Sequence, residues 1–369
     1  MQKMKNIEFL RLVAILGIVL LHFFYTRSGI FSMHLNIPIY NEMSKWAAEG
    51  QKGVDFFFIL SGLFFYLGFA RNPEQKFGDF IKKKFIRMWP VMAFISIVGG
   101  ILALFGLANY SLSGDIYALL FLNGTPLLER YSGNLGSAWY CSVMMIHFIF
   151  FFYLLKNFNP KIVWLVIAVG VYFSYSMLLQ CNHFRIYNKQ HIFAYIFNVQ
   201  MLRAWGGIGI GMLIALWYKH YENAIQNYTP SISTKVLITA GEVICLGYMI
   251  CNLLYYHARN TMLRNDLMFI LVFVAIIAAF ICNKGYVSQI LNRNIFVSLS
   301  KYVYSIFLTH ILVFIALKRG FWAKHPDILA QYPITNLCAA LLISFIVGVL
   351  IYHLVEVKSK NYLTKKLFN

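Results

Sequence analysis

Charged residues are scarce in this chain. Only 12% of its 369 residues are Asp, Glu, Lys or Arg, whereas 60% are hydrophobic. Soluble domains contain about 25% charged residues, so the composition excludes an ordinary soluble protein. Apolar runs of about 20 residues, long enough to cross a bilayer, recur along the sequence. The chain is therefore predicted to be an integral membrane protein with many helices.

Cysteine motifs and linkers are also lacking. The six cysteines form no Cys-x-x-Cys pair, so the sequence indicates neither a zinc site nor a disulfide framework, and no metal is predicted. No Pro-rich, Ser-rich or low-complexity segment interrupts the apolar runs. We therefore expect residues 1–369 to form one membrane domain without an appended soluble domain.

The apolar runs predict about ten transmembrane helices in a single all-α bundle. The expected spans are 7–26, 53–70, 89–108, 137–155, 162–179, 199–218, 235–254, 266–282, 299–317 and 336–355. An even number of spans puts both termini on the same side of the membrane. Counted with the adjoining ends of the spans, the two chain ends and four alternate connections hold 20 of the 32 Lys and Arg residues, so both termini are expected in the cytoplasm.

The formal net charge of +19 would suggest nucleic-acid binding in a soluble protein. Here the cations lie between membrane spans, where the positive-inside bias and anionic lipid headgroups account for them. Membrane lipid is therefore an expected partner, and nucleic acid is not.

Two ionisable residues in the first span, Arg11 and His22, require an explanation. An Arg inside a span costs about 2.5–3.5 kcal/mol on insertion scales, so such groups usually face a bundle interior or a watery cavity and mark a site. The two residues are 11 positions apart, which puts them on one helix face about 16 Å apart along the axis. His22 is a candidate general base.

The second span contains Asp55 and Ser61. Asp55 is expected at the outer end of its helix, where it could reach His22 if the two helices are neighbours, and could then fix the tautomer of the imidazole. The alternative is that Asp55 simply lies at the membrane interface. Ser61 is either a possible site residue or, with Gly62, a place of close helix packing.

A basic segment, residues 80–90, precedes the third span. Lys84 and Arg87 are three residues apart and can point the same way, which suits a phosphate group. The alternative is anchoring to lipid headgroups. Pro90 is suited to the first turn of the helix.

Three further features have alternative readings. Trp139 is placed to stack on a sugar ring or to join an interfacial aromatic belt. His310 is a second mid-span histidine, either part of a site or hydrogen-bonded core. The glycines at 206–211 imitate a dinucleotide-binding motif, but they follow no strand, and close helix packing explains them better.

These residues together resemble the acyltransferase type three family, whose polytopic members transfer acyl groups from coenzyme A to surface polysaccharides and related glycans. The resemblance covers the whole chain. It rests on Arg11 and His22 at the family's spacing, on Gly-Val-Asp-Phe-Phe-Phe-Ile-Leu-Ser-Gly at 53–62, and on Lys84-x-x-Arg87-x-x-Pro90. The Tyr-Ser-Ile-Phe-Leu-Thr-His run at 304–310 agrees with the family's ninth-helix signature.

The resemblance implies that His22 is the catalytic histidine and that Arg11, Lys84 and Arg87 serve donor binding or pore architecture. It also implies acetyl-CoA or another acyl-CoA as donor substrate, a glycan or glycolipid acceptor, and a bacterial inner membrane. Two departures stand out. In the fourth span, Met144 occupies the position at which many family members have an acid. At the end of the last span many members have Glu-x-Pro, but here the residue two positions after Glu356 is Lys358.

We therefore predict a membrane O-acyltransferase, with acetyl as the expected acyl group, in which His22 removes the proton of a glycan hydroxyl and Asp55 orients His22. Direct transfer needs no other nucleophile, whereas an acyl-enzyme route would use Ser61 or His22 as carrier. The rival from another class is a transporter or flippase for a glycan precursor, because intramembrane ionisable groups also mark transport pathways. A membrane subunit without chemistry would leave Arg11 and His22 unexplained.

Overall fold

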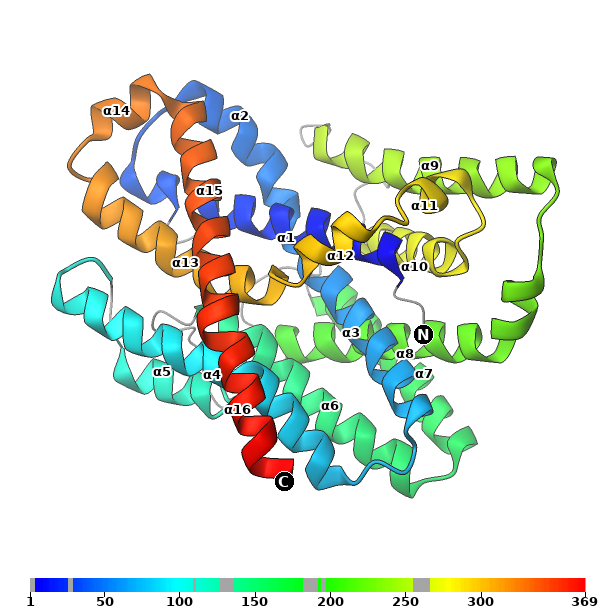
Figure 1. The fold of residues 1–369 in the computed structure, drawn as a ribbon. Coiled ribbons are helices and arrows are strands. Elements are labelled where there is room, and N and C mark those ends of the chain that lie inside the picture. The colour runs from blue at the N-terminus through cyan, green and yellow to red at the C-terminus, as the bar shows by residue number, and fades with distance from the viewer. Residues whose placement is uncertain are drawn as a thin grey trace. The chain divides into compact units, whose positions relative to one another are not determined.

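The protein is almost entirely helical in the computed structural model, which describes residues 4–25, 29–108, 111–126, 136–181, 192–193, 197–254 and 266–368 (Figure 1). The only strands within these ranges are β1 (Ile192–Phe193) and β2 (Phe197–Asn198), which pair antiparallel. The predicted all-α fold is confirmed.

Each of the ten predicted spans corresponds to an apolar helix. In the described part of the chain, nine helical segments are long and apolar enough to cross a membrane, and α10 is a shorter apolar helix of 17 residues. The main helices are α1 (Lys5–Tyr25), α3 (Lys52–Arg71), α4 (Phe77–Leu104), α6 (Trp139–Asn157), α7 (Pro160–Cys181), α8 (Val199–Asn227), α9 (Ile232–Leu254), α10 (Asp266–Cys282), α13 (Val303–Leu317) and α15 (Pro333–Ile351).

Shorter helices connect the main ones or follow the last of them. They are η1 (Ile30–Met33), α2 (Pro38–Ala47), η2 (Ala48–Gln51), α5 (Leu112–Leu119), η3 (Gly136–Ala138), α11 (Tyr286–Ile290), α12 (Asn294–Ser300), η5 (Lys318–Trp322), α14 (Pro326–Gln331), η6 (Tyr352–Glu356) and α16 (Val357–Phe368). One boundary differs from expectation. Pro90 lies inside α4, not in its first turn, because the basic segment is already helical from Phe77 onward.

The chain forms two compact units. Unit 1 comprises residues 1–14, 51–74 and 150–301, and unit 2 comprises 15–50, 75–149 and 302–369. Each unit is built from segments far apart in the sequence. The prediction of a single membrane domain stays a prediction, and the two units are described separately below.

Glycines bring α3 and α8 together in unit 1. A Cβ atom on Gly62 would overlap the carbonyl group of Ile208, and one on Gly211 would overlap the carbonyl of Ile59. Only a residue without a side chain allows two helix backbones to approach this closely. Close packing, predicted for the glycines of the sixth span, is confirmed there, and Gly62 follows the packing alternative given for it.

Helix α13 is the central element of unit 2 and packs against α4 and α15. The hydroxyl of Tyr304, near its start, donates to the backbone oxygen of Met88 on α4 at 2.7 Å. Near its other end, Phe314 packs edge-to-face against Phe23 of α1. Helix α15 continues through η6, a π-helical segment, into α16 as one long red helix in Figure 1.

Candidate active site

Two histidines from distant parts of the chain meet in unit 2. His22 lies in the last turn of α1, and His310 lies in the middle of α13, fully buried. The Nε2 atom of His310 is 2.9 Å from the Nδ1 atom of His22, and the ring centroids are 4.8 Å apart. The structure thus joins the two histidines that the sequence analysis singled out separately.

The hydrogen bonds of His310 determine which nitrogen atoms carry protons. Its Nδ1 atom donates to the backbone oxygen of Ile306, one turn earlier, at 3.0 Å, because a carbonyl oxygen can only accept. In a neutral ring Nε2 is then an acceptor, so Nδ1 of His22 must donate to it. The lone pair of His22 is therefore on Nε2, which is the atom able to take a proton from a substrate.

The first turn of α13 contacts the backbone of α4 next to Arg87, and it also contacts Glu356. Tyr304 binds the backbone of α4 next to Arg87, and the hydroxyl of Ser305 donates to Oε2 of Glu356 at 2.7 Å. Tyr304 precedes His310 by six residues, which is about 9 Å of helix rise. The α4 backbone beside Arg87 therefore lies within about 10 Å, along α13, of the level of the histidine pair.

Lys84 and Arg87 both lie on α4, in the same unit as the histidine pair. The Nζ atom of Lys84 is 4.2 Å from the ring centroid of Phe148 and 5.4 Å from that of Phe80, an arrangement that stabilises a cation by cation–π attraction. Arg87 is exposed. One cation is held by aromatic rings, and the other is accessible to an anion.

Trp139 also lies in unit 2, at the first position of α6. Its ring centroid is 6.3 Å from that of Tyr140, and the Tyr140 ring is 5.5 Å from Phe307, which precedes His310 by three residues. Three aromatic rings thus lead from Trp139 to the helix that carries His310. Sugar stacking by Trp139 stays a prediction.

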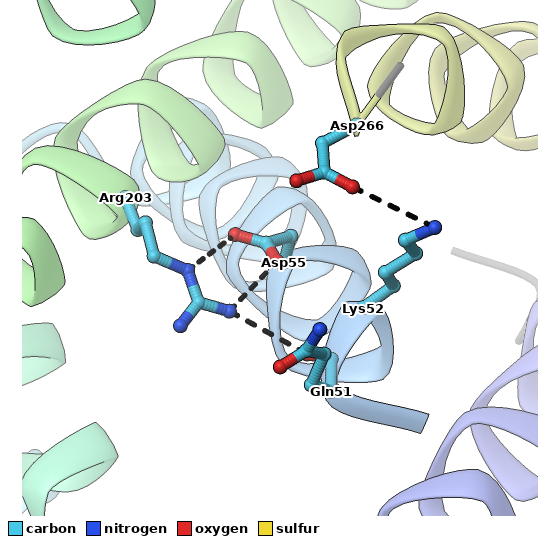
Figure 2. A network of polar contacts seen from close by, with 5 residues as sticks. All are labelled: Gln51, Lys52, Asp55, Arg203 and Asp266. Carbon is cyan, nitrogen blue, oxygen red and sulfur yellow. Dashed lines mark hydrogen bonds and ion pairs between the residues drawn. The ribbon is translucent and has the colours of Figure 1, made fainter. Parts of the chain in front are cut away.

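Asp55 has a partner that the sequence analysis did not assign. Its two carboxylate oxygens accept hydrogen bonds from Arg203 of α8 at 3.0 and 2.8 Å, in unit 1 (Figure 2). Asp55 is fully buried, and Arg203 is 7% exposed, so this ion pair is shielded from solvent. His22 belongs to unit 2, and the predicted orientation of His22 by Asp55 stays a prediction.

A second ion pair lies beside the first. The Nζ atom of Lys52 is 3.7 Å from Oδ1 of Asp266 and 3.4 Å from the ring centroid of Phe269 (Figure 2). Helix α3 therefore contributes an anion and a cation to two neighbouring buried pairs. A buried charge needs a counter-charge. This requirement could have pointed from Asp55 and Lys52 to oppositely charged partners such as Arg203 and Asp266.

The remaining predicted site residues lie in unit 1. Arg11 forms an ion pair with Glu8, one turn earlier, at 2.6 Å. Ser61 lies on α3 beside Gly62, where α3 meets α8. A common donor site of Arg11 with Lys84 and Arg87 would involve both units, and it stays a prediction. No group of three His, Cys, Asp or Glu side chains among the described residues is placed to hold a metal ion.

These features define a polytopic helical membrane protein with a hydrogen-bonded pair of histidines. A family profile described as an acyltransferase domain matches residues 4–353. The chain belongs to the acyltransferase type three family, whose members transfer acyl groups. No curated protein and no solved structure gave a significant match.

Proposed function

We propose that the protein is an O-acetyltransferase that moves an acetyl group from cytoplasmic acetyl-CoA to a hydroxyl of a surface polysaccharide, oligosaccharide or related glycan. Membership of the family supports membrane acyltransferase activity. The observation that carries the chemistry is the hydrogen bond between His22 and His310, because it holds the lone pair of His22 on Nε2.

In the proposed reaction the acceptor oxygen attacks the thioester carbonyl carbon while Nε2 of His22 takes the hydroxyl proton. The C–S bond then breaks, and the proton passes from His22 to the departing thiolate of coenzyme A. General base catalysis of this kind contributes about 10²–10⁴ in rate. Protonation makes His22 a cation, and the acceptor Nε2 of His310 stabilises that cation through the existing hydrogen bond.

Lys84 and Arg87 are proposed to bind the phosphates of the donor. Their positions on α4, close in sequence to the Met88 backbone that binds Tyr304, support donor binding near the first turns of α13. From that level to His310 is about 9 Å of rise, a distance that the extended pantetheine arm of coenzyme A is able to span. Arg11 and Asp55 keep their predicted roles in donor binding and in the orientation of His22.

The same proposal puts the protein in a bacterial inner membrane with both termini on the cytoplasmic side. Its support is that 20 of the 32 Lys and Arg residues lie at the chain ends, on alternate connections and at the adjoining span ends. A reporter that fluoresces only in the cytoplasm, fused after Asn369, is expected to be bright. A dark full-length fusion would reverse the orientation and put Lys84 and Arg87 on the wrong side for coenzyme A.

The decisive experiment measures thiol release and acetyl transfer with purified protein, labelled acetyl-CoA and a panel of oligosaccharides. His22→Ala is expected to abolish transfer while the protein stays monodisperse. His147→Asn is the matched control, because His147 is another buried histidine of unit 2, and its Nδ1 atom donates to the backbone oxygen of Val143. Normal turnover of His22→Ala would refute the assignment of His22 as the general base. If the wild-type protein consumes no thioester, the transporter alternative is favoured instead.

A further inference from the structure

The last long helix of unit 2 carries a row of exposed apolar side chains on one side. Ile346, Leu350 and Leu354, here called the apolar row, follow one another at intervals of four residues, which puts them on one helix face, and they are 48%, 51% and 57% exposed. The opposite face packs on α13, because a Cβ atom on Gly348 would meet the side chain of Ile306. The apolar row of a membrane-spanning helix is therefore expected to face lipid chains.

The same face continues into α16 with a different chemistry. Lys358, Tyr362 and Lys365, here called the basic row, occupy the next positions at intervals of four, four and three residues, and all three are exposed. Helix α16 contains four lysines and no acidic residue. The face thus changes from hydrocarbon to cations and an aromatic ring just beyond residue 355, where the predicted span ends.

The spacing of the two rows matches the layers of a bilayer. Lys358 and Lys365 lie about 6 and 16 Å beyond Leu354 along the helix axis, and the headgroup layer is about 5–8 Å thick. Helical side chains lean toward the start of their helix, which for α16 is the end nearer the membrane, and long lysine side chains reach back to the interface. Lys358 therefore reaches the level of the phosphates, and Lys365 comes within a Debye length, about 8 Å, of it.

Two cations of α4 adjoin the far end of α16. The two helices are in contact, and the Nζ atoms of Lys82 and Lys83 lie 5.7 and 5.9 Å from the ring centroid of Phe368. Both lysines are exposed. The positive charge of α16 is therefore increased by its neighbour, and a lipid with a net negative charge is attracted more strongly than a zwitterionic lipid.

We propose that this face of α15 and α16 binds an anionic phospholipid, with an acyl chain along the apolar row and its phosphate at Lys358 and Lys365. Tyr362 lies between the two lysines, and tyrosine is a residue that favours the membrane interface. The phosphates of coenzyme A have the same charge, but that molecule has no long hydrocarbon chain to cover the apolar row. The site does not rest on the proposed function, because binding is measured without any transfer of acetyl groups.

The probes are phosphatidylglycerol, which is anionic, and phosphatidylcholine, which is zwitterionic, both with the same photoactivatable acyl chain. Each is added as a minor component to vesicles of unlabelled phosphatidylcholine that contain the full-length protein. Phosphatidylglycerol is expected to label the peptide with the apolar row about fivefold or more above phosphatidylcholine, because each lysine near the membrane surface favours an anionic lipid about fivefold.

Lys358→Gln removes one phosphate contact. It is expected to lower labelling by phosphatidylglycerol about fivefold and to leave labelling by phosphatidylcholine unchanged. Lys360→Gln is the matched control, because it removes the same charge from the same helix on another face. Lys360 follows Glu356 by one turn and interacts with it electrostatically, and Glu356 accepts a hydrogen bond from Ser305 on the packed face of the helix. Labelling of Lys360→Gln is expected to stay close to that of wild type.

Free coenzyme A separates the two sources of phosphate. An excess of it is expected to leave labelling by phosphatidylglycerol unchanged, and displacement of the lipid would assign the lysines to donor phosphates and overturn the proposal. The proposal is also overturned if the wild-type peptide is not labelled or if both lipids label it equally. Equal losses in Lys358→Gln and Lys360→Gln would overturn it as well, because they would indicate diffuse attraction to the membrane without a site.

Discussion

Replacement of His310 tests the hydrogen bond between the two histidines. His310→Phe keeps a ring of similar size between Phe307 and Phe314, whose centroids lie 6.2 and 6.0 Å from the imidazole. It removes one hydrogen-bond partner of His22, whose ring also bonds the backbone of Ile18. His310→Gln keeps an acceptor, because its side-chain oxygen reaches approximately the position of Nε2. The comparison of these two variants separates the hydrogen bond from packing.

The expected loss follows from the kind of hydrogen bond removed. Before the reaction both rings are neutral, and such a bond contributes about 0.5–1.5 kcal/mol, which biases the tautomers of His22 roughly 2- to 13-fold. When His22 becomes a cation the bond is charge-assisted and contributes about 1.5–3 kcal/mol. Only the difference between these two contributions, about 1–1.5 kcal/mol, lowers the barrier. His310→Phe is therefore expected to lower kcat about 5- to 13-fold, less than the loss of up to about 10⁴ expected for His22→Ala.

The assay is steady-state release of coenzyme A by purified variants, with acetyl-CoA titrated at saturating acceptor. We expect His310→Phe to lower kcat with little change in KM for acetyl-CoA, because His310 acts through His22 and not on the donor phosphates. His310→Gln is expected to recover part of the lost rate. A monodisperse His310→Phe variant with wild-type kcat would refute the reasoning, and so would equal activity of the Phe and Gln variants.

Three further outcomes are expected. Lys84→Gln should raise KM for acetyl-CoA and weaken its dependence on salt; an unchanged KM would assign this cation to lipid headgroups. Asp55→Asn leaves the buried guanidinium of Arg203 without its ionic partner, which typically costs about 3–5 kcal/mol, so the melting temperature should fall clearly. The double variant Asp55→Leu with Arg203→Met removes both charges and should melt at a higher temperature than Asp55→Asn alone. Gly62→Ala should melt lower than Gly68→Ala, where a Cβ atom finds open space, and equal melting of the two would contradict the close packing of α3 with α8.

The positions of the helices could be predicted from the sequence because a bilayer imposes a length on every apolar run. Each of the ten predicted spans has a helix, although α10 has only 17 residues. Helix ends were less predictable. The basic segment before Pro90 is polar enough to suggest a loop, yet α4 begins at Phe77 because helical hydrogen bonding continues past the apolar stretch.

Individual residues of the candidate site could be predicted from the sequence, but the contacts between them could not. Charge in an apolar span marked His22, Asp55 and His310, whereas the contact between His22 and His310 depends on how α1 and α13 pack, 288 residues apart. The partner of Asp55 was missed for the same reason. Arg203 stands at the edge of a glycine-rich run, and its role becomes visible only when α3 and α8 are in contact.

The ion pair of Asp55 with Arg203 has a consequence for biosynthesis. The two residues are separated by 148 positions, and ribosomes add about 5–20 residues per second. The carboxylate of α3 is therefore made roughly 7–30 s before the guanidinium that neutralises it. Until α8 emerges, α3 has neither its counter-charge nor the glycine-lined surface on which it packs. The final packing of α3 therefore forms only after α8 has been made.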